Sequence, residues 1–315
     1  MTARGPVLVT GGTGFVGTHV IARLLSDGWA VRTTVRSPDR AGEVREAVGG
    51  DPEFAVASLD SDVGWAEAVD GCAYVLHVAS PFPADDPADE DEVIRPARDG
   101  AVRVLRAARD AGVRRVVLTS SFAAVGYSGT TRGFYDETDW TDPADDNTAY
   151  VKSKAVAERA AWDFAREGGP ELAVINPTGI FGPVLSPRLS TSTGLIKAML
   201  EGTMPVVPRS YFGVVDVRDV ADAHVRAMTA PSAAGERFLV SSGPAMSFAQ
   251  IAELLGVPVR EAPGEAEVPV IRTDKARNVL GWEPRDQRTT IRETAESLRR
   301  SGLLGGSGRS RGPRQ

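Results

Sequence analysis

Short apolar runs alternate with longer amphipathic stretches along the first two-thirds of the chain. Val16, Val20, Leu24 and Leu25 recur at helical spacing, and a second apolar stripe follows residues 92–111. We expect six strands around such helices, at residues 7–9, 30–35, 53–57, 73–78, 116–119 and 172–175. This alternation predicts an α/β fold in which a doubly wound parallel sheet is covered by helices on both faces.

The rhythm changes after residue 177, where prolines at positions 177, 183, 187, 205 and 208 break the chain into short pieces. We therefore predict a first domain at residues 1–177 and a smaller, discontinuous portion that occupies mainly residues 178–300. Residues 213–217 resemble another strand of the main sheet, and Asp219 is placed to cap the next helix. Segments near 213–230 should then return to the first domain, whereas residues 301–315, rich in Gly, Ser and Arg, predict a disordered tail.

The composition allows a sizeable core and limits the partners. Of 315 residues, 42% are hydrophobic and 25% charged, and the net charge is −6. No basic stripe accompanies aromatic residues, so we expect no nucleic acid partner. No apolar run reaches the roughly 18 residues of a membrane helix, and no leader is recognisable, so we expect no membrane partner and a cytoplasmic location.

Cysteine and histidine usage argues against disulfide and metal chemistry. Cys72 is the single cysteine, so no intrachain disulfide can form. The three histidines, His19, His77 and His224, lie too far apart for a recognisable zinc motif. We predict no metal site, and a reducing compartment suits the chain.

A glycine-rich segment, Thr10-Gly11-Gly12-Thr13-Gly14-Phe15-Val16-Gly17, lies directly between the first expected strand and helix. This context predicts a Rossmann-type dinucleotide site, because the helix N-terminus would face the pyrophosphate. Gly11 would permit a tight turn, Gly14 the approach of phosphate and Gly17 the packing of helix on strand. A plain strand-turn-helix corner is the alternative. The predicted cofactor contacts here are Thr10, Gly11, Gly14, Phe15, Val16 and Gly17.

The end of the second strand indicates which dinucleotide is bound. An NAD site places a carboxylate there for the ribose hydroxyls, but this chain continues with Arg36 and Ser37. A guanidinium can hold a phosphate dianion through paired hydrogen bonds, so these two residues predict NADP(H). The alternative for Arg36 is a solvated surface arginine.

Tyr150 and Lys154 lie four residues apart on an expected helix and therefore share a face. The ammonium group would favour the phenolate and lower a pKa that is ordinarily about 10, which suits proton transfer. The fifth strand ends in Ser120 and Ser121, where ligands bind in such sheets, and a hydroxyl there could donate to a carbonyl oxygen. We predict Ser121, Tyr150 and Lys154 as catalytic residues.

These motifs resemble the extended short-chain dehydrogenase/reductases, and in particular the group of dihydroflavonol, cinnamoyl-CoA and methylglyoxal reductases. The likeness spans residues 5–300, and its most specific segments are residues 31–36, 77–82, 176–183 and 215–221. It implies that Tyr150 is the acid, that Lys154 also binds the nicotinamide ribose, and that Ser121, rather than Ser120, orients the carbonyl. Tyr150 and Lys154 thus count among the cofactor-binding residues, to which the resemblance adds Ala79, Ser80 and Pro177.

One position departs from the family pattern. Relatives usually carry Asp-Leu after the third strand, where the aspartate holds the adenine amine, but this chain has Ser58-Leu59. Either Asp60 or the Ser58 hydroxyl could replace that aspartate, and the sequence leaves both open.

The leading hypothesis is an NADPH-dependent reductase of aldehydes or ketones, with residues 1–177 binding NADP and residues 178–300 mainly a small-molecule carbonyl or alcohol substrate. An NAD-dependent nucleotide-sugar epimerase or dehydratase is one alternative, and a non-catalytic dinucleotide sensor is another. The family implies a monomer or a homodimer. Residues 182–212 are mixed in character and do not identify the substrate.

Overall fold

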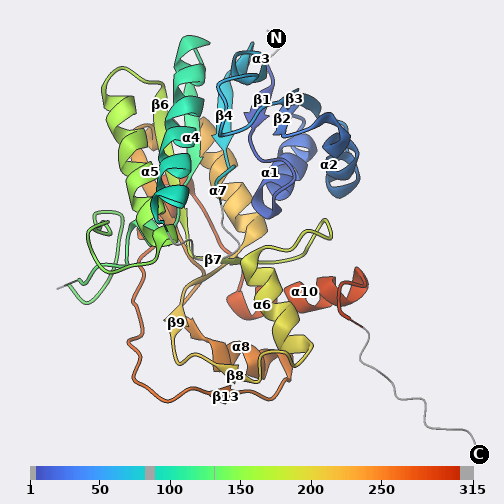
Figure 1. The fold of residues 1–315 in the computed structure, drawn as a ribbon, viewed down its shortest axis with the longest axis vertical. Coiled ribbons are helices and arrows are strands. Elements are labelled where there is room, and N and C mark those ends of the chain that lie inside the picture. Colours follow the sequence, from blue (N-terminus) through green and yellow to red (C-terminus); the bar gives the residue numbers. More distant parts are fainter. Residues whose placement is uncertain (1–4, 82–88, 131, 306–315) are drawn as a thin grey trace, which may run out of the picture.

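The computed structural model describes residues 5–81, 89–130 and 132–305, and its upper half in Figure 1 is a sheet between two layers of helices. The sheet has seven parallel strands in the order β11-β6-β5-β4-β1-β2-β3. These strands are β1 (Val7–Val9), β2 (Val31–Val35), β3 (Glu53–Val56), β4 (Tyr74–His77), β5 (Arg115–Thr119), β6 (Glu171–Pro177) and β11 (Glu236–Val240). The Rossmann-type α/β fold predicted from the sequence is therefore confirmed.

The six expected strands are all present in this sheet, but the seventh strand, β11, was not expected. It pairs along the outer edge of β6, from Glu236 opposite Ala173 to Val240 opposite Pro177. Because β11 takes that edge, the segment near residue 215 does not pair with β6. Instead β10 (Val214–Asp216) pairs with β7 (Gly179–Phe181) in a separate two-stranded sheet, so the expectation of another main-sheet strand there is wrong.

Side chains of successive strand residues enter two different cores, as the alternation of a β-strand requires. On β1, Val7 and Val9 contribute to one core, and Leu8 contributes to the other. The first core is covered by α1 (Phe15–Ser26), α2 (Ala41–Val48), α7 (Val217–Thr229) and α9 (Asp274–Leu280). The second core is covered by α3 (Trp65–Val69), α4 (Asp91–Asp110) and α5 (Ala149–Arg166).

A third core fills the smaller half of the molecule, which lies below the sheet in Figure 1. Its helices are α6 (Thr191–Leu200), α8 (Phe248–Leu255) and α10 (Gln287–Arg300). Besides β7 and β10, its short strands are β8 (Val206–Val207), β9 (Tyr211–Phe212), β12 (Met246–Ser247) and β13 (Arg260–Glu261). In the described ranges there are also three short 3-10 helices, at Pro38–Arg40, Phe122–Ala124 and Pro231–Ala233.

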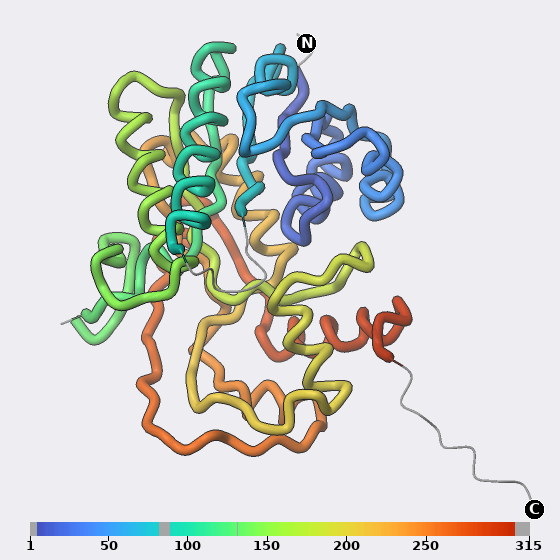
Figure 2. Tube along the Cα trace, in the orientation of Figure 1, coloured from blue at the N-terminus to red at the C-terminus, as the bar shows by residue number. Residues whose placement is uncertain are grey.

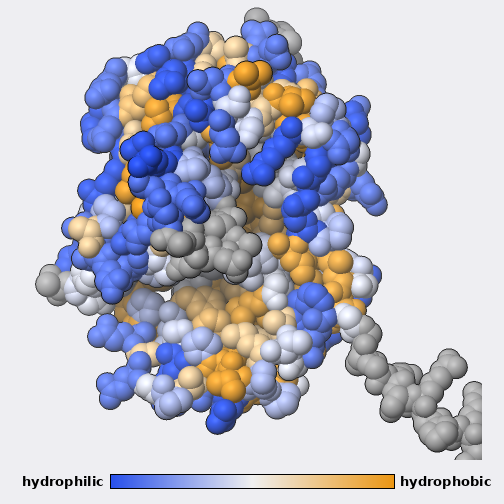
Figure 3. Space-filling view, viewed as in Figure 1, coloured by the Kyte–Doolittle hydropathy of each residue, from blue (hydrophilic) through white to orange (hydrophobic). Residues whose placement is uncertain are grey.

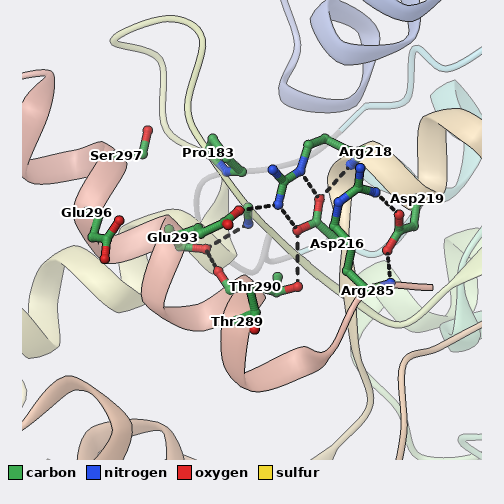
Figure 4. A network of polar contacts seen from close by, with 12 residues as sticks. Pro183, Asp216, Arg218, Asp219, Arg285, Thr289, Thr290, Glu293, Glu296 and Ser297 are labelled. Carbon is green, nitrogen blue, oxygen red and sulfur yellow. Dashed lines mark hydrogen bonds and ion pairs between the residues drawn. The ribbon is translucent and has the colours of Figure 1, made fainter.

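The two halves are joined by a polar network around the buried carboxylate of Asp216 (Figure 4). Asp216 accepts hydrogen bonds from the backbone N–H of Arg218 at 2.9 Å, from the Arg218 guanidinium at 2.6 and 2.8 Å, and from the Thr290 hydroxyl at 3.1 Å. Asp216 is the N-cap of α7, so the expectation that Asp219 caps this helix is wrong. Asp219 lies in the first turn and instead accepts from the backbone N–H of Arg285 at 2.6 Å. One carboxylate thus ties α10 to the start of α7.

A second connection runs along the side of the molecule (Figure 2), where the segment before α9 meets the loop that follows β5. The backbone N–H of Tyr135 donates to Val270 at 2.8 Å, and the N–H of Arg272 donates back to Tyr135 at 2.9 Å. This pairing attaches the loop after β5 to the chain that returns from the smaller half.

Two of the sequence-based expectations involve residues that the structure does not describe, and one concerns a domain boundary. Phe82, the last residue of one family-like segment, and residues 306–315 of the expected tail lie outside the described residues. The division near residue 177 stays a prediction. Within the described ranges, no helix is long and apolar enough to cross a membrane.

Candidate active site

The predicted site residues follow the carboxyl ends of neighbouring parallel strands. The glycine segment follows β1, Arg36 follows β2, Ala79 and Ser80 follow β4, and Ser121 follows β5. Pro177 is the last residue of β6. Carboxyl ends of parallel strands meet at one edge of the sheet, which is where ligands bind in doubly wound folds. The fold therefore gathers these residues along one edge.

The glycine segment is packed too tightly for side chains at three positions. Gly11 has a φ of +74°, and a Cβ there would lie 3.0 Å from the Cα of Ala79. A Cβ on Gly17 would lie 2.2 Å from the carbonyl oxygen of Gly11. Gly12, to which the sequence assigned no role, would place a Cβ 2.3 Å from Oγ1 of Thr33. The turn thus presses against β2 and the segment after β4.

Gly14 differs from these three glycines. A Cβ there would meet a single neighbour, the Gly11 carbonyl oxygen at 3.2 Å, and otherwise open space. Gly14 is also the N-cap of α1 and has no side chain to cap it. The first N–H groups of a helix have no intrahelical acceptor, so this helix end presents donors beside an open glycine. The cradle fits a dinucleotide pyrophosphate.

The Thr10 hydroxyl fixes the segment after β4 against the glycine turn. Its oxygen accepts hydrogen bonds from the backbone N–H groups of Val78 at 3.0 Å and Ala79 at 2.9 Å. Thr10 therefore holds the glycine turn and the segment after β4 together beside the predicted cofactor site.

At the end of β2, Arg36 is exposed and forms no hydrogen bond or ion pair within the described part of the chain. Its neighbours are engaged differently, since the Ser37 hydroxyl donates to Asp39 and Arg40 pairs with Glu43 at 2.9 Å. Arg36 is therefore the guanidinium at this strand end whose donors are available to a phosphate.

The two candidates for adenine recognition lie together at the end of β3. The Ser58 hydroxyl and the Asp60 carboxylate are 3.4 Å apart, and the backbone N–H of Asp60 also points to the Ser58 oxygen at 3.4 Å. The indole of Trp65 holds this turn by donating to the Ser58 and Ser61 carbonyls, each at 3.0 Å. Ser58 and Asp60 therefore both remain candidates for binding the adenine amine at the end of β3.

The predicted catalytic side chains meet near the start of α5, whose N-cap Thr148 accepts from the backbone N–H of Val151. Tyr150 lies in the first turn of the helix and shares a side-chain hydrogen bond with Ser121. Lys154 lies one turn further, with Nζ 5.5 Å from the centre of the Tyr150 ring. The same ammonium group donates to the Ser80 hydroxyl at 2.8 Å. The ends of β4 and β5 and the first turns of α5 thus meet around the phenol and the ammonium group.

Burial shifts both titratable groups of this set. It raises the pKa of Tyr150, against the opposing effect of the Ser121 hydrogen bond. The sequence predicted a lowered value, but the cost of burying a phenolate outweighs that hydrogen bond. Burial also lowers the pKa of Lys154 to about 8, while the charge of Glu158 opposes that shift. At neutral pH the phenol is therefore protonated and the lysine charged.

Sequence reasoning missed the carboxylate behind these groups. Glu158 follows Lys154 by four residues and is completely buried. The available signal was its spacing, because Tyr150, Lys154 and Glu158 recur every four residues on one helix face. A glutamate on a helix is usually solvated, and the pattern alone does not identify a buried one.

The surface is hollowed between the sheet-bearing half and the smaller half, and hydrophobic side chains lie in this hollow (Figure 3). The two halves of the fold thus border a surface hollow. Such a concave, largely apolar surface beside a few polar groups is typical of small-molecule sites.

Comparison with known proteins identifies the family. The model of the NAD dependent epimerase/dehydratase family matches residues 7–241. The chain is 36% identical to cinnamoyl-CoA reductase CAD2 of Medicago truncatula, over 93% of this chain and 95% of that protein. It is 35% identical to dihydroflavonol 4-reductase of Zea mays, over 76% of this chain and 70% of that protein.

Among solved structures, the methylglyoxal/isovaleraldehyde reductase Gre2 of yeast, complexed with NADPH, superposes with a TM-score of 0.80. The identity is 28%, over 95% of this chain and all of that one. The fold, the family model and these relatives agree with the resemblance seen in the sequence. The chain is therefore an oxidoreductase of the NAD dependent epimerase/dehydratase family, in the extended short-chain group that includes the cinnamoyl-CoA and dihydroflavonol reductases.

Proposed function

We propose that this protein is an NADPH-dependent carbonyl reductase that converts an aldehyde or ketone into an alcohol. The observation that carries the proposal is the hydrogen bond between Ser121 and Tyr150, with the Lys154 ammonium one helical turn away. This set lies at the same sheet edge as the glycine cradle, so a carbonyl beside a bound dinucleotide would be within reach of both hydroxyls.

The side chains supply orientation and a proton. NADPH, when bound, supplies the hydride to the carbonyl carbon. Ser121 donates a hydrogen bond to the carbonyl oxygen and thereby fixes its position. Tyr150 transfers its phenolic proton to that oxygen as negative charge develops, which completes the alcohol and leaves a phenolate. The positive charge of Lys154 stabilises this phenolate, and bulk solvent returns the proton.

The raised pKa of Tyr150 suits reduction in particular. A general acid must hold its proton at the working pH, and burial keeps this phenol protonated at neutral pH. The reverse reaction needs the phenolate as a base, which the same burial disfavours. The site is thus better prepared for reducing a carbonyl than for oxidising an alcohol at neutral pH.

The choice of NADPH rests on Arg36 and Ser37. The free guanidinium of Arg36 would grip the 2′-phosphate, and no carboxylate occupies the end of β2, where an NAD site would hold the ribose. Thr10, Gly11, Gly14, Phe15, Val16 and Gly17 would hold the pyrophosphate half, and Ala79, Ser80, Tyr150, Lys154 and Pro177 the nicotinamide half.

The test is to follow oxidation of NADPH and NADH with a panel of aldehydes, ketones and acyl thioesters. Turnover of an aldehyde or ketone with a preference for NADPH is the expected result. Co-purification of NAD together with conversion of a nucleotide sugar would favour the epimerase alternative. A stoichiometric NADPH complex that reduces no carbonyl would favour a sensor and contradict the proposal.

A further inference from the structure

The Glu158 carboxylate accepts hydrogen bonds from four side chains, although it is completely buried. Oε2 accepts from the Ser120 hydroxyl at 2.5 Å and from Nδ2 of Asn176 at 2.7 Å. Oε1 accepts from Nε of Arg237 at 2.7 Å and from the Trp162 indole at 3.2 Å. A buried carboxylate needs such partners, so this position is built for a negative charge.

Two of these donors adjoin predicted site residues. Ser120 directly precedes Ser121, and Asn176 directly precedes Pro177. Asn176 also donates to the backbone carbonyl of Ser121 at 3.2 Å. Glu158 therefore connects the helix that carries Tyr150 to the ends of β5 and β6. A displaced carboxylate would move Ser121 relative to the phenol.

Arg237 extends the network to the loop before α5. Its Nη1 donates to the backbone carbonyls of Glu137 at 3.1 Å and Asp139 at 2.8 Å. Its guanidinium also lies 3.7 Å from the ring centre of Trp140. The buried ion pair of Glu158 and Arg237 thus links α5 to β11, and Arg237 in turn links β11 to the loop before α5.

The negative charge of Glu158 also acts on Lys154, because it raises the pKa that burial lowers. Both line a cavity of about 20 Å³, which leaves room for about one water molecule. Among the described residues, the other titratable groups facing Lys154 are Tyr150, protonated at neutral pH, and His77 from β4, whose pKa burial lowers to about 3. From α4, the cavity receives only alanines, Ala97 and Ala101. Among the described residues, Glu158 is therefore the charged group that offsets the cost of burying this ammonium, in addition to the hydrogen bond to Ser80.

We propose that Glu158 is a positioning residue of the reductase, which holds Ser121 in register with Tyr150 and keeps the buried Lys154 ammonium charged. The proposal rests on the proposed function for its kinetic readout. It adds to that function a residue that touches neither substrate nor cofactor and acts through Lys154 and the Ser120-Ser121 turn.

The test is Glu158→Gln, which preserves shape and removes the charge. In the native protein, NADPH affinity and kcat should both fall as the pH rises through about 8, where Lys154 loses its charge. Without the opposing carboxylate, the midpoint of this fall should move to lower pH by about one unit. Fluorescence titration of NADPH at each pH measures the affinity without turnover.

Asp216→Asn is the matched control, because Asp216 is an equally buried, arginine-paired carboxylate away from Lys154. It should lower the melting temperature and leave the pH midpoint unchanged. An unchanged midpoint in folded Glu158→Gln, or an equal shift in Asp216→Asn, would overturn the proposal.

If Glu158→Gln does not fold, the double variant with Arg237→Gln removes both buried charges and leaves neither unpaired. It should show the same shift of the midpoint, and an unshifted midpoint would again contradict the proposal. The two proposals can also fail separately. If the pH midpoint of NADPH affinity shifts in the Glu158 variant but the native protein reduces no carbonyl, the role of Glu158 is supported and the reductase function is contradicted.

Discussion

The Thr10 hydroxyl and Nδ1 of His77 are hydrogen-bonded at 2.8 Å, and the partners of Thr10 determine the direction of this bond. Both lone pairs of the hydroxyl accept from backbone N–H groups, those of Val78 and Ala79. The single proton of Thr10 therefore goes to His77, which must be neutral and carry its own proton on Nε2. This pair locks the glycine turn to the end of β4.

Thr10→Val should loosen this junction. The substitution keeps the volume but leaves two backbone N–H groups and a buried imidazole nitrogen without their partner, so we expect a loss of about 2 kcal/mol in the free energy of unfolding. Urea denaturation measures this loss. Thr10→Ser, which keeps the hydroxyl, should lose much less, and equal losses in the two variants would contradict the assigned bonds.

Gly14→Ala and Gly17→Ala should separate cofactor affinity from stability. Gly17→Ala forces a Cβ to within 2.2 Å of a backbone oxygen, so it should destabilise the fold by about 1–3 kcal/mol. Gly14→Ala meets little but open space, so its unfolding free energy should change much less while NADPH affinity falls. Thermal melting and fluorescence titration distinguish the two. Normal NADPH binding by Gly14→Ala would argue against phosphate at this position.

The sequence predicted those helices and strands whose hydrophobic residues recur with a regular spacing within the element itself. The spacing of Val16, Val20 and Leu24 predicted α1, and the stripe over residues 92–111 predicted α4 almost to its ends. The strand β11 could not be found in this way. It lies within the proline-broken region, and its pairing with β6 depends on contacts between residues far apart in the chain.

Arg36→Ala should weaken NADPH binding and leave NADH binding almost unchanged, because only NADPH carries the 2′-phosphate. Loss of a charge-assisted, paired hydrogen bond predicts about a tenfold or greater rise in KM for NADPH. Arg45→Ala is the control, since Arg45 is an exposed arginine of α2 that pairs with Asp51. Equal effects on both dinucleotides would assign Arg36 to the solvated surface.

The protein should lose stability between pH 7 and pH 5. Burial lowers the pKa of His19 and His224 to about 4 and that of His77 to about 3, from an ordinary value of 6.5. Below pH 6.5 the unfolded chain therefore binds more protons than the folded one, so acidification favours unfolding. Integrated from pH 7 to pH 5, each histidine lowers the free energy of unfolding by about 2 kcal/mol, or about 6 kcal/mol for the three.

Urea midpoints measured across this range check the slope. His224 donates from Nδ1 to the Val220 carbonyl at 2.7 Å and, when neutral, accepts at Nε2 from Thr119 at 2.7 Å, so both ring nitrogens of the neutral side chain are hydrogen-bonded. His224→Gln cannot take up a proton and should reduce the slope by about a third. A midpoint that is flat from pH 7 to pH 5 would contradict the buried, neutral state of these side chains.

The candidate site was predictable where a residue type and its spacing are tied to the chemistry, as for Tyr150 with Lys154. The raised pKa of Tyr150 was not predictable, since burial depends on contacts between residues far apart in the chain. Glu158 was hidden for a similar reason, because its partner Arg237 lies on a strand 79 residues away. The sequence shows that these residues exist, but not that they meet.

The most direct test of the account is the turnover number of Tyr150→Phe with NADPH and an accepted aldehyde or ketone. The variant lacks only the phenolic hydroxyl, so we predict that kcat falls by about a hundredfold or more while NADPH still binds. Tyr135→Phe is the control, because its hydroxyl donates to the Ser128 carbonyl and has no part in the proposed proton transfer. A Tyr150→Phe variant that reduces the carbonyl as fast as the native protein would show that the proton comes from another group and that the proposed mechanism is wrong.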